Sequence, residues 1–303
     1  MFSKEALSEI ENLISIKEKI VIVTHYNPDG DAIGSSLGLK HFLRNRGVEA
    51  EIIVPNDFPK FLKWMPEAKK ITIAEYKKRK AIELIEAADV VFCLDFNTYT
   101  RIGMVGDWVS NSKAVKILID HHQQPGEFDF VYSDTNIPAT SQMVYHFIEA
   151  LGQENIVDEN TAKCLYTGIM TDTGGFRYRS TSATTHRIIA NLIEKGANPA
   201  EISSNTWDNN TVSRLKLLSL ILGRVELVKD SEVLESFYRL VINMAIVGVG
   251  MMIVFFWLIF LFSKRLKGYL RKIQRIFTKM AAGDLTERFY IKKHDEIGRL
   301  MLD

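Results

Sequence analysis

The stretch that decides the fold is VIVTHYNPDGDAIGSS, residues 21–36, in which a run of aliphatic residues stops at His25. Two aspartates, Asp29 and Asp31, follow at once, and a helical pattern then runs to Gly47. A continuous β-branched run, without alternating polar residues, is typical of a strand covered on both faces of a parallel sheet. The stretch therefore predicts a buried strand that ends in ionisable side chains.

The same pattern recurs along the first 230 residues. Further strands are predicted by aliphatic runs at 49–55, 88–96 and 114–122. After residue 133 the pattern is mostly helical, with helices predicted at 141–151, 159–174, 182–196 and 211–227. Strands that alternate with helices predict the α/β class, with a parallel sheet and helices on both faces. The basic stretch HFLRNRG, residues 41–47, is predicted to be a solvent-exposed helix face.

Composition limits the classes of function. A formal net charge of +1 argues against a general polyanion binder. Only two cysteines occur, Cys93 and Cys164, so the chain has no disulfide framework. Both stand in apolar surroundings, and we expect them to be inert thiols in the core.

Acidic and imidazole side chains gather where the predicted elements end. They are His25, Asp29, Asp31, Asp95, Asp120, His121 and His122 after strands, and Asp172 at a helix end beside a glycine pair. Since the carboxyl ends of parallel strands meet at one edge, we expect these side chains to converge. Each motif alone is also explained as a turn or a strand edge.

A divalent cation would relieve the repulsion between so many buried acids. Mixed carboxylate and imidazole ligands suit Mn²⁺, with Mg²⁺, Co²⁺ and Zn²⁺ as alternatives. The number of ligands suits a pair of cations, the usual arrangement for phosphoester hydrolysis.

Four stretches resemble the motifs of the DHH phosphoesterase superfamily, most closely its oligoribonuclease/pAp-phosphatase branch. They are THYNPDGDAIGSSLGL (24–39), LDFN (94–97), IDHH (119–122) and TGIMTDTGGFRY (167–178). The resemblance covers about residues 1–230. It implies a hydrolase with two Mn²⁺ ions, or Mg²⁺ or Co²⁺ in their place. The implied substrates are short RNA or DNA oligonucleotides and 3′-phosphoadenosine 5′-phosphate (pAp).

The resemblance also implies a role for each motif residue. One ion would be held by His25 and Asp29, the other by Asp31, His121 and Asp172, with Asp95 bridging the two. The catalytic pair would be His122, facing the substrate phosphate, and Asp120, orienting an imidazole. Arg101 and Arg177 follow motif residues closely and are candidate phosphate contacts, with a surface ion pair as the alternative.

The C-terminal part has a different character. Residues 240–262 carry no charge and are long enough to cross a bilayer. Seven Lys or Arg and no acid lie between 264 and 279, which places this flank in the cytoplasm by the positive-inside rule. GDLT and DEIGRL, within residues 264–303, resemble a HAMP module, which implies a homodimer through parallel helices. The alternative is a basic amphipathic anchor on anionic lipid.

We therefore predict a DHH domain (1–230), a junction (231–239), a transmembrane helix (240–262) that contacts lipid, and a HAMP-like helical segment (263–303) with a truncated second helix. The branch carries a further domain, DHHA1, whose glycine-rich histidine motif we do not find. The DHH domain alone would be cytoplasmic, and the side on which it lies stays open. Three hypotheses remain: a membrane-tethered phosphoesterase, a nucleotide-binding sensor signalling through HAMP without turnover, and an inactive chimeric chain joining two genes.

Overall fold

The computed structural model describes residues 2–16, 19–208, 212–225 and 230–281. These residues fall into two compact units, Met1–Lys216 and Leu217–Asp303.

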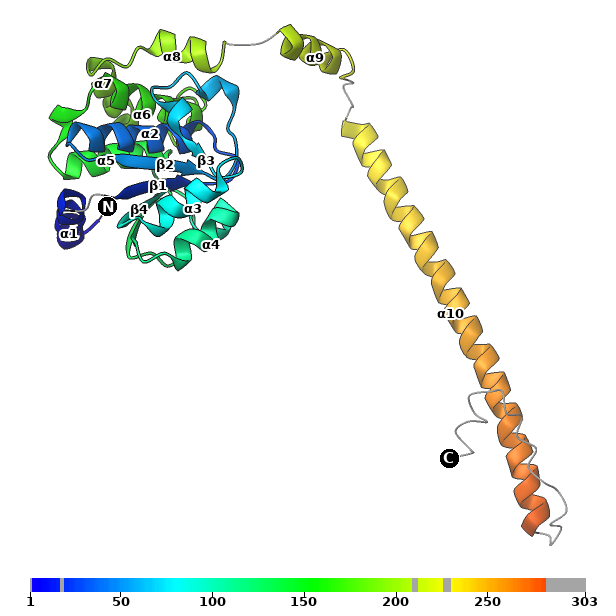
Figure 1. Ribbon diagram of the computed structural model, residues 1–303. Helices are drawn as coiled ribbons and strands as arrows, with labels where there is room; N and C mark the ends of the chain where they lie inside the picture. The colour runs from blue at the N-terminus through cyan, green and yellow to red at the C-terminus, as the bar shows by residue number, and fades with distance from the viewer. Residues whose placement is uncertain (1, 17–18, 209–211, 226–229, 282–303) are drawn as a thin grey trace. The chain divides into compact units, whose positions relative to one another are not determined.

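The first unit contains a six-stranded parallel sheet in the order β3-β2-β1-β4-β5-β6 (Figure 1). The strands are β1 (Ile20–Thr24), β2 (Ala50–Val54), β3 (Thr72–Ile73), β4 (Val90–Leu94), β5 (Val115–Asp120) and β6 (Phe130–Ser133). Every residue of β1 and β4 is buried, as their continuous aliphatic runs predict.

Helices cover both faces of this sheet (Figure 1). On one face lie α1 (Lys4–Ile16), α2 (Gly30–Asn45) and α5 (Thr140–Ala150), and α6 (Glu159–Asp172) and α7 (Ala183–Glu194) pack against these helices in the same core. The other face packs against α3 (Lys78–Glu86) and α4 (Met104–Asn111). Alternate residues of β1 divide between the two cores, since Ile22 belongs to the first and Val23 to the second. The predicted α/β class and parallel sheet are confirmed.

Shorter elements complete the unit. They are the 3₁₀ helices η1 (Lys60–Leu62), η2 (Ala68–Lys70), η3 (Tyr99–Ile102) and η4 (Glu154–Ile156), and the helix α8 (Pro199–Thr206). The start of α9 (Val212–Leu222) also lies in this unit, and the boundary between the units falls within that helix.

Three details differ from the sequence-based expectation. The strands β3 and β6 were not predicted, because they are short edge strands without a continuous aliphatic run. The prediction of an exposed helix face at 41–47 is wrong for its first half, since His41, Phe42 and Leu43 are fully buried. Cys93 and Cys164 are buried free thiols, as expected.

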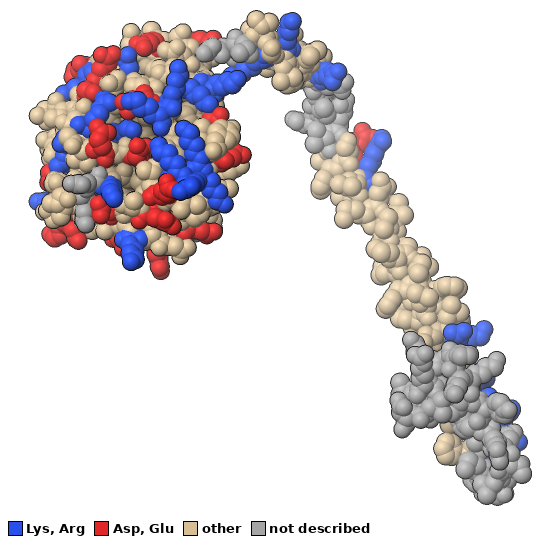
Figure 2. Space-filling model, viewed as in Figure 1, with Lys and Arg blue, Asp and Glu red and all other residues tan. Residues whose placement is uncertain are grey.

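The second unit contains the long helix α10 (Asp230–Ala281), which runs without a break through the predicted junction and membrane span. It is long and apolar enough to cross a membrane between Leu234 and Lys279. Figure 2 shows no Lys, Arg, Asp or Glu along its middle, where residues 240–262 lie. The predicted second helix of the HAMP-like segment (263–303) lies outside the described residues, which end at residue 281.

Candidate metal centre

Three neighbouring strands deliver the predicted ligands to one edge of the sheet. β4 pairs in parallel with β1 on one side and with β5 on the other, and Leu94 is level with Thr24 and with Ile119. The next residues along the chain are Asp95, His25 and Asp120. The direction in which the chain winds reverses between β1 and β4, which opens a crevice at their carboxyl ends.

The first ligand group consists of His25, Asp29 and Asp95, whose ligand atoms all lie within 4.8 Å of one another. His25 Nε2 lies 3.8 Å from Asp29 Oδ1 and 3.5 Å from Asp95 Oδ2. The other ring nitrogen, Nδ1, is 2.9 Å from the carbonyl oxygen of Tyr26. A proton on Nδ1 would be held by that carbonyl, which leaves Nε2 free to bind a cation.

Asp29 also begins the helix that carries the next ligand. Its Oδ1 accepts hydrogen bonds from the backbone amides of Asp31 and Ala32, each 3.0 Å long, and so caps α2. The sequence DGD thus combines a helix start with two ligands, one on each side of Gly30. A side chain on Gly30 would collide with Thr171 of α6.

The second ligand group consists of Asp31, His121 and Asp172, again within 4.8 Å. His121 Nε2 lies 3.4 Å from Asp172 Oδ2. Asp31 is fully buried in the first turn of α2, and Asp172 is the last residue of α6. The position of the Asp31 carboxylate relative to that of Asp172 therefore depends on how α2 and α6 pack together.

Asp95, a member of the first group, also faces the second. One of its oxygens, Oδ2, faces His25 Nε2, and the other, Oδ1, faces His121 Nε2, both at 3.5 Å. Its backbone adopts a φ of +65°, a conformation that a non-glycine residue seldom adopts and that clusters at functional sites. This orientation is the one that a carboxylate shared by two cations requires.

Asp120 and His122 form a close pair beside these groups, and His122 also makes a third group of possible ligands with Asp95 and His121. His122 Nδ1 lies 2.7 Å from Asp120 Oδ1, the shortest His–Asp contact among the described residues. Asp120 is fully buried, and its other oxygen has no hydrogen-bond partner in the described chain. The imidazole is about one third exposed, so Asp120 fixes a ring that remains accessible.

The buried charges shift each other's pKa values strongly. Burial disfavours the charged form of His25, but the nearby carboxylates of Asp29 and Asp95 outweigh it and raise its pKa to about 10. Burial acts in the same way on His121, where the nearby carboxylate of Asp95 raises the pKa to about 10. In Asp95 burial is outweighed by the nearby imidazoles of His121 and His25, which hold its pKa well below the usual range.

The two acids of the second group shift in the other direction. Burial, and then the charge of Asp95, raises the pKa of Asp172 to about 7 and that of Asp31 well above its ordinary value. Without a cation, the cluster therefore relies on protons to offset its negative charge. These donor types and their spacing fit a divalent cation, which would take the place of those protons.

The two candidate phosphate contacts, Arg101 and Arg177, are exposed. The Arg101 carbonyl accepts a hydrogen bond of 2.8 Å from the amide of Tyr26, which ties η3 to the loop after His25. Arg177 Nε donates to the carbonyl of Gly174 at 2.7 Å, in the loop after Asp172. Both arginines thus stand on segments next to predicted ligands.

Two residues that contact the cluster were missed by the sequence reasoning. Thr140 and Ser141, at the start of α5, hydrogen-bond to Asp31, and Thr140 also to Asp95. They lie more than 100 residues after Asp31 and outside the four motifs, so no local pattern marked them. The one signal was Ala139 at the helix start, where a side-chain cap is usual.

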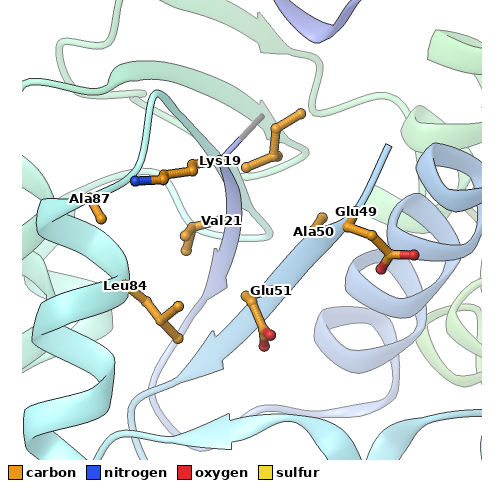
Figure 3. A pocket seen from close by; sticks show the side chains of 8 residues that line it. Lys19, Val21, Glu49, Ala50, Glu51, Leu84 and Ala87 are labelled. Carbon is orange, nitrogen blue, oxygen red and sulfur yellow. The ribbon is translucent and has the colours of Figure 1, made fainter. Parts of the chain in front are cut away.

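A cavity of about 270 Å³ lies away from the cluster (Figure 3). It is lined by Ile20 and Val21 at the start of β1 and by Ala50 and Glu51 at the start of β2, with Lys19, Glu49, Leu84 and Ala87 around them. Since both strands begin there, the cavity is at the edge opposite to the ligands. It takes no part in the candidate centre.

Comparison with known proteins identifies the family. The family described as "DHH family, N-terminal domain" matches residues 19–169, which contain every predicted ligand except Asp172. The chain contains a DHH domain. A second match, the HAMP domain, covers residues 261–302. With the apolar helix α10, this match indicates association with a membrane.

Individual proteins with similar sequences are consistent with the DHH match. The chain is 36% identical over 194 residues to the bifunctional oligoribonuclease and PAP phosphatase NrnA of Thermus thermophilus, matching 64% of this chain and 55% of that protein. It is 27% identical over 228 residues to NrnA of Bacillus subtilis, matching 74% of this chain and 67% of that protein. The chain thus spans little more than half the length of the Thermus relative.

One solved structure resembles the first unit closely. It is an exopolyphosphatase-related protein from Bacteroides fragilis, 40% identical, with a TM-score of 0.74 over 76% of this chain and 68% of that one.

Proposed function

We propose that the DHH unit of this chain is a divalent-metal-dependent phosphoesterase that hydrolyses short oligonucleotides or pAp. The observation that carries the proposal is the pair of ligand groups, with Asp95 facing a histidine of each. The names of the curated relatives supply the substrate class, since they are oligoribonucleases and PAP phosphatases.

The proposed ligand sets follow the two groups. His25 and Asp29 hold one ion, while Asp31, His121 and Asp172 hold the other, and Asp95 bridges them. Mn²⁺ is the proposed ion because the donors mix carboxylate oxygen and imidazole nitrogen, and Mg²⁺ and Co²⁺ are the competitors. Bound divalent cations supply an activated water nucleophile and offset the charge of the phosphoryl oxygens.

The remaining residues act on the substrate and on protons. Asp120 holds Nδ1 of His122, so the Nε2 atom of that ring is free to donate to a phosphoryl oxygen or to the leaving group. The exposed guanidinium groups of Arg101 and Arg177 bind substrate phosphates. The membrane contact of residues 240–262 and a homodimer through the HAMP segment belong to the same proposal.

The test uses the full chain in detergent with Mn²⁺, followed by phosphate release from pAp and shortening of a dinucleotide. We expect both products from the wild-type chain and none from Asp95→Asn. Asp107→Asn, an exposed aspartate on α4, is the matched control and should keep full activity. Full activity of the Asp95→Asn chain would reject the bridging role.

A second candidate is a sensor that binds nucleotide and signals through HAMP without turnover. The HAMP match directly after an apolar helix favours it. In the same assay a sensor would bind Mn²⁺ and pAp, which calorimetry detects, but would release no product. A chain that neither binds nor hydrolyses would support the third hypothesis, an inactive chimera.

A further inference from the structure

The start of helix α5 joins the two ligand groups through one residue. The N-terminal amides of a helix need acceptors, and Ala139, the residue before α5, has no side-chain acceptor. The missing acceptor comes from Asp31, on a different helix. Asp31 Oδ2 accepts from the amide of Thr140 at 2.5 Å, and Oδ1 accepts from the amide of Ser141 at 2.8 Å.

This contact fixes the carboxylate of Asp31 in two directions. Each oxygen has its own amide donor, and the positive end of the α5 dipole lies beside the negative charge. Asp31, Thr140 and Ser141 are fully buried, so no water competes for these hydrogen bonds. The plane of the Asp31 carboxylate is therefore set by α5 before any cation arrives.

The side chain of Thr140 reaches the other group. Its Oγ1 donates a hydrogen bond of 2.9 Å to Asp95 Oδ1, the oxygen that faces His121. Thr140 thus holds Asp31 with its backbone and Asp95 with its hydroxyl. Because threonine is branched at Cβ, its hydroxyl has few rotamers within a helix and keeps its direction.

We infer that Thr140 is a positioning residue that holds Asp31 and Asp95 in the arrangement that binds two cations. The inference rests on the proposed function, since it concerns the ligands of that centre. Asp95 needs such support because its backbone stays in a seldom-adopted conformation, with φ at +65°. Partners of this kind typically change metal affinity 10- to 100-fold when removed.

The decisive comparison is between Thr140→Val and Thr140→Ser in the full chain in detergent, with Mn²⁺ titrated by calorimetry. Valine keeps the shape and the backbone amide but removes the donor, so we expect binding at least about tenfold weaker for one ion. Serine keeps the donor and should stay within about threefold of the wild type. Thr72→Val is the control, because Thr72 is buried and its hydroxyl has no partner in the described chain.

The outcomes of this experiment distinguish failure of the inference from failure of the proposed function. Mn²⁺ affinity and stoichiometry in Thr140→Val equal to wild type would overturn the inference and leave the metal centre intact. A wild-type chain that takes up no Mn²⁺ would overturn the proposed function itself. If Thr140→Val does not fold, as judged by its circular dichroism melt, Thr140→Ala replaces it, and equal affinities of the alanine and serine variants would again overturn the inference.

Discussion

Gly168 offers a sharp test of how packing between helices controls the candidate metal centre. It lies on α6, one turn before Asp172, where α6 packs against α2 and α5. A Cβ added to Gly168 would overlap Ser141 Oγ and would lie 2.8 Å from Asp31 Oδ1. Ordinary contact begins at 3.4 Å, so Gly168→Ala must displace the Asp31 contact by about 0.6 Å.

Two opposing effects decide whether Gly168→Ala raises or lowers the stability of the chain. Alanine in a helix interior is favoured over glycine by about 1 kcal/mol. Overpacking against groups held by hydrogen bonds costs about 1–3 kcal/mol. The variant should therefore range from neutral to about 2 kcal/mol less stable. A displacement above about 0.5 Å is enough to spoil a preorganised site, so Mn²⁺ affinity should fall about tenfold or more.

Gly38→Ala is the matched control for this prediction. Gly38 also lies between α2 and α6, but a Cβ there would meet the flexible side chain of Leu165 instead of a metal ligand. We expect a loss of thermal stability similar to that of Gly168→Ala, because this Cβ would overlap the side chain of the buried Leu165, and an unchanged Mn²⁺ affinity. Calorimetric titration of both variants measures the difference. Equal Mn²⁺ affinity for wild type and Gly168→Ala would refute the claim that this packing sets the ligand geometry.

Three other predictions concern protons and the loops around the centre. Asp120→Asn should lower kcat for pAp about 100-fold and leave the Mn²⁺ affinity unchanged, because it disturbs only the proton on His122. Steady-state kinetics measures kcat, and calorimetry measures the Mn²⁺ affinity. The pKa of His25 is raised to about 10, so protonated His25 stabilises the metal-free chain fully below about pH 6.5, and this stabilisation is lost as the pH rises through 10. Urea melts in EDTA should show the decline. A free energy of unfolding that does not change over this pH range would contradict the prediction. Gly175→Ala should lower the free energy of unfolding by about 2 kcal/mol, because φ is +71° and the new Cβ would lie 2.7 Å from the Trp207 ring. In a Trp207→Ala background the same substitution should lower it by only about 1 kcal/mol. Equal losses in urea melts of the two backgrounds would exclude the Trp207 contact as a cause.

The convergence of the acidic and imidazole side chains could be predicted from the sequence because one rule places most of them. Parallel strands end at one edge, so ionisable residues after β1, β4 and β5 must meet whatever the loops do. Asp172 stands at the end of a helix instead, where the glycine pair beside it was the local signal, and the motif resemblance then assigned it to the second ion. The structure brings it within 3.4 Å of His121.

Contacts made across the chain could not be predicted in this way. Thr140 lies 109 residues from Asp31, and the register between α2 and α5 depends on close packing that no local pattern encodes. The stretch 41–47 was misjudged for a similar reason. Its charged residues suggested an exposed face, but Glu67 pairs with both Lys40 and Arg44, which allows the helix to be buried.

The two leading hypotheses differ in what happens after the cations bind. Every proposed ligand, together with Asp120 and His122, lies between residues 25 and 172, inside the first unit. Metal binding therefore needs neither α10 nor the HAMP segment. Turnover also needs the substrate held in line and shielded from water, whereas the side chains of Asp29 and His122 are partly exposed. Binding of Mn²⁺ and pAp with slow hydrolysis would thus indicate that substrate positioning, and not cation binding, limits this chain.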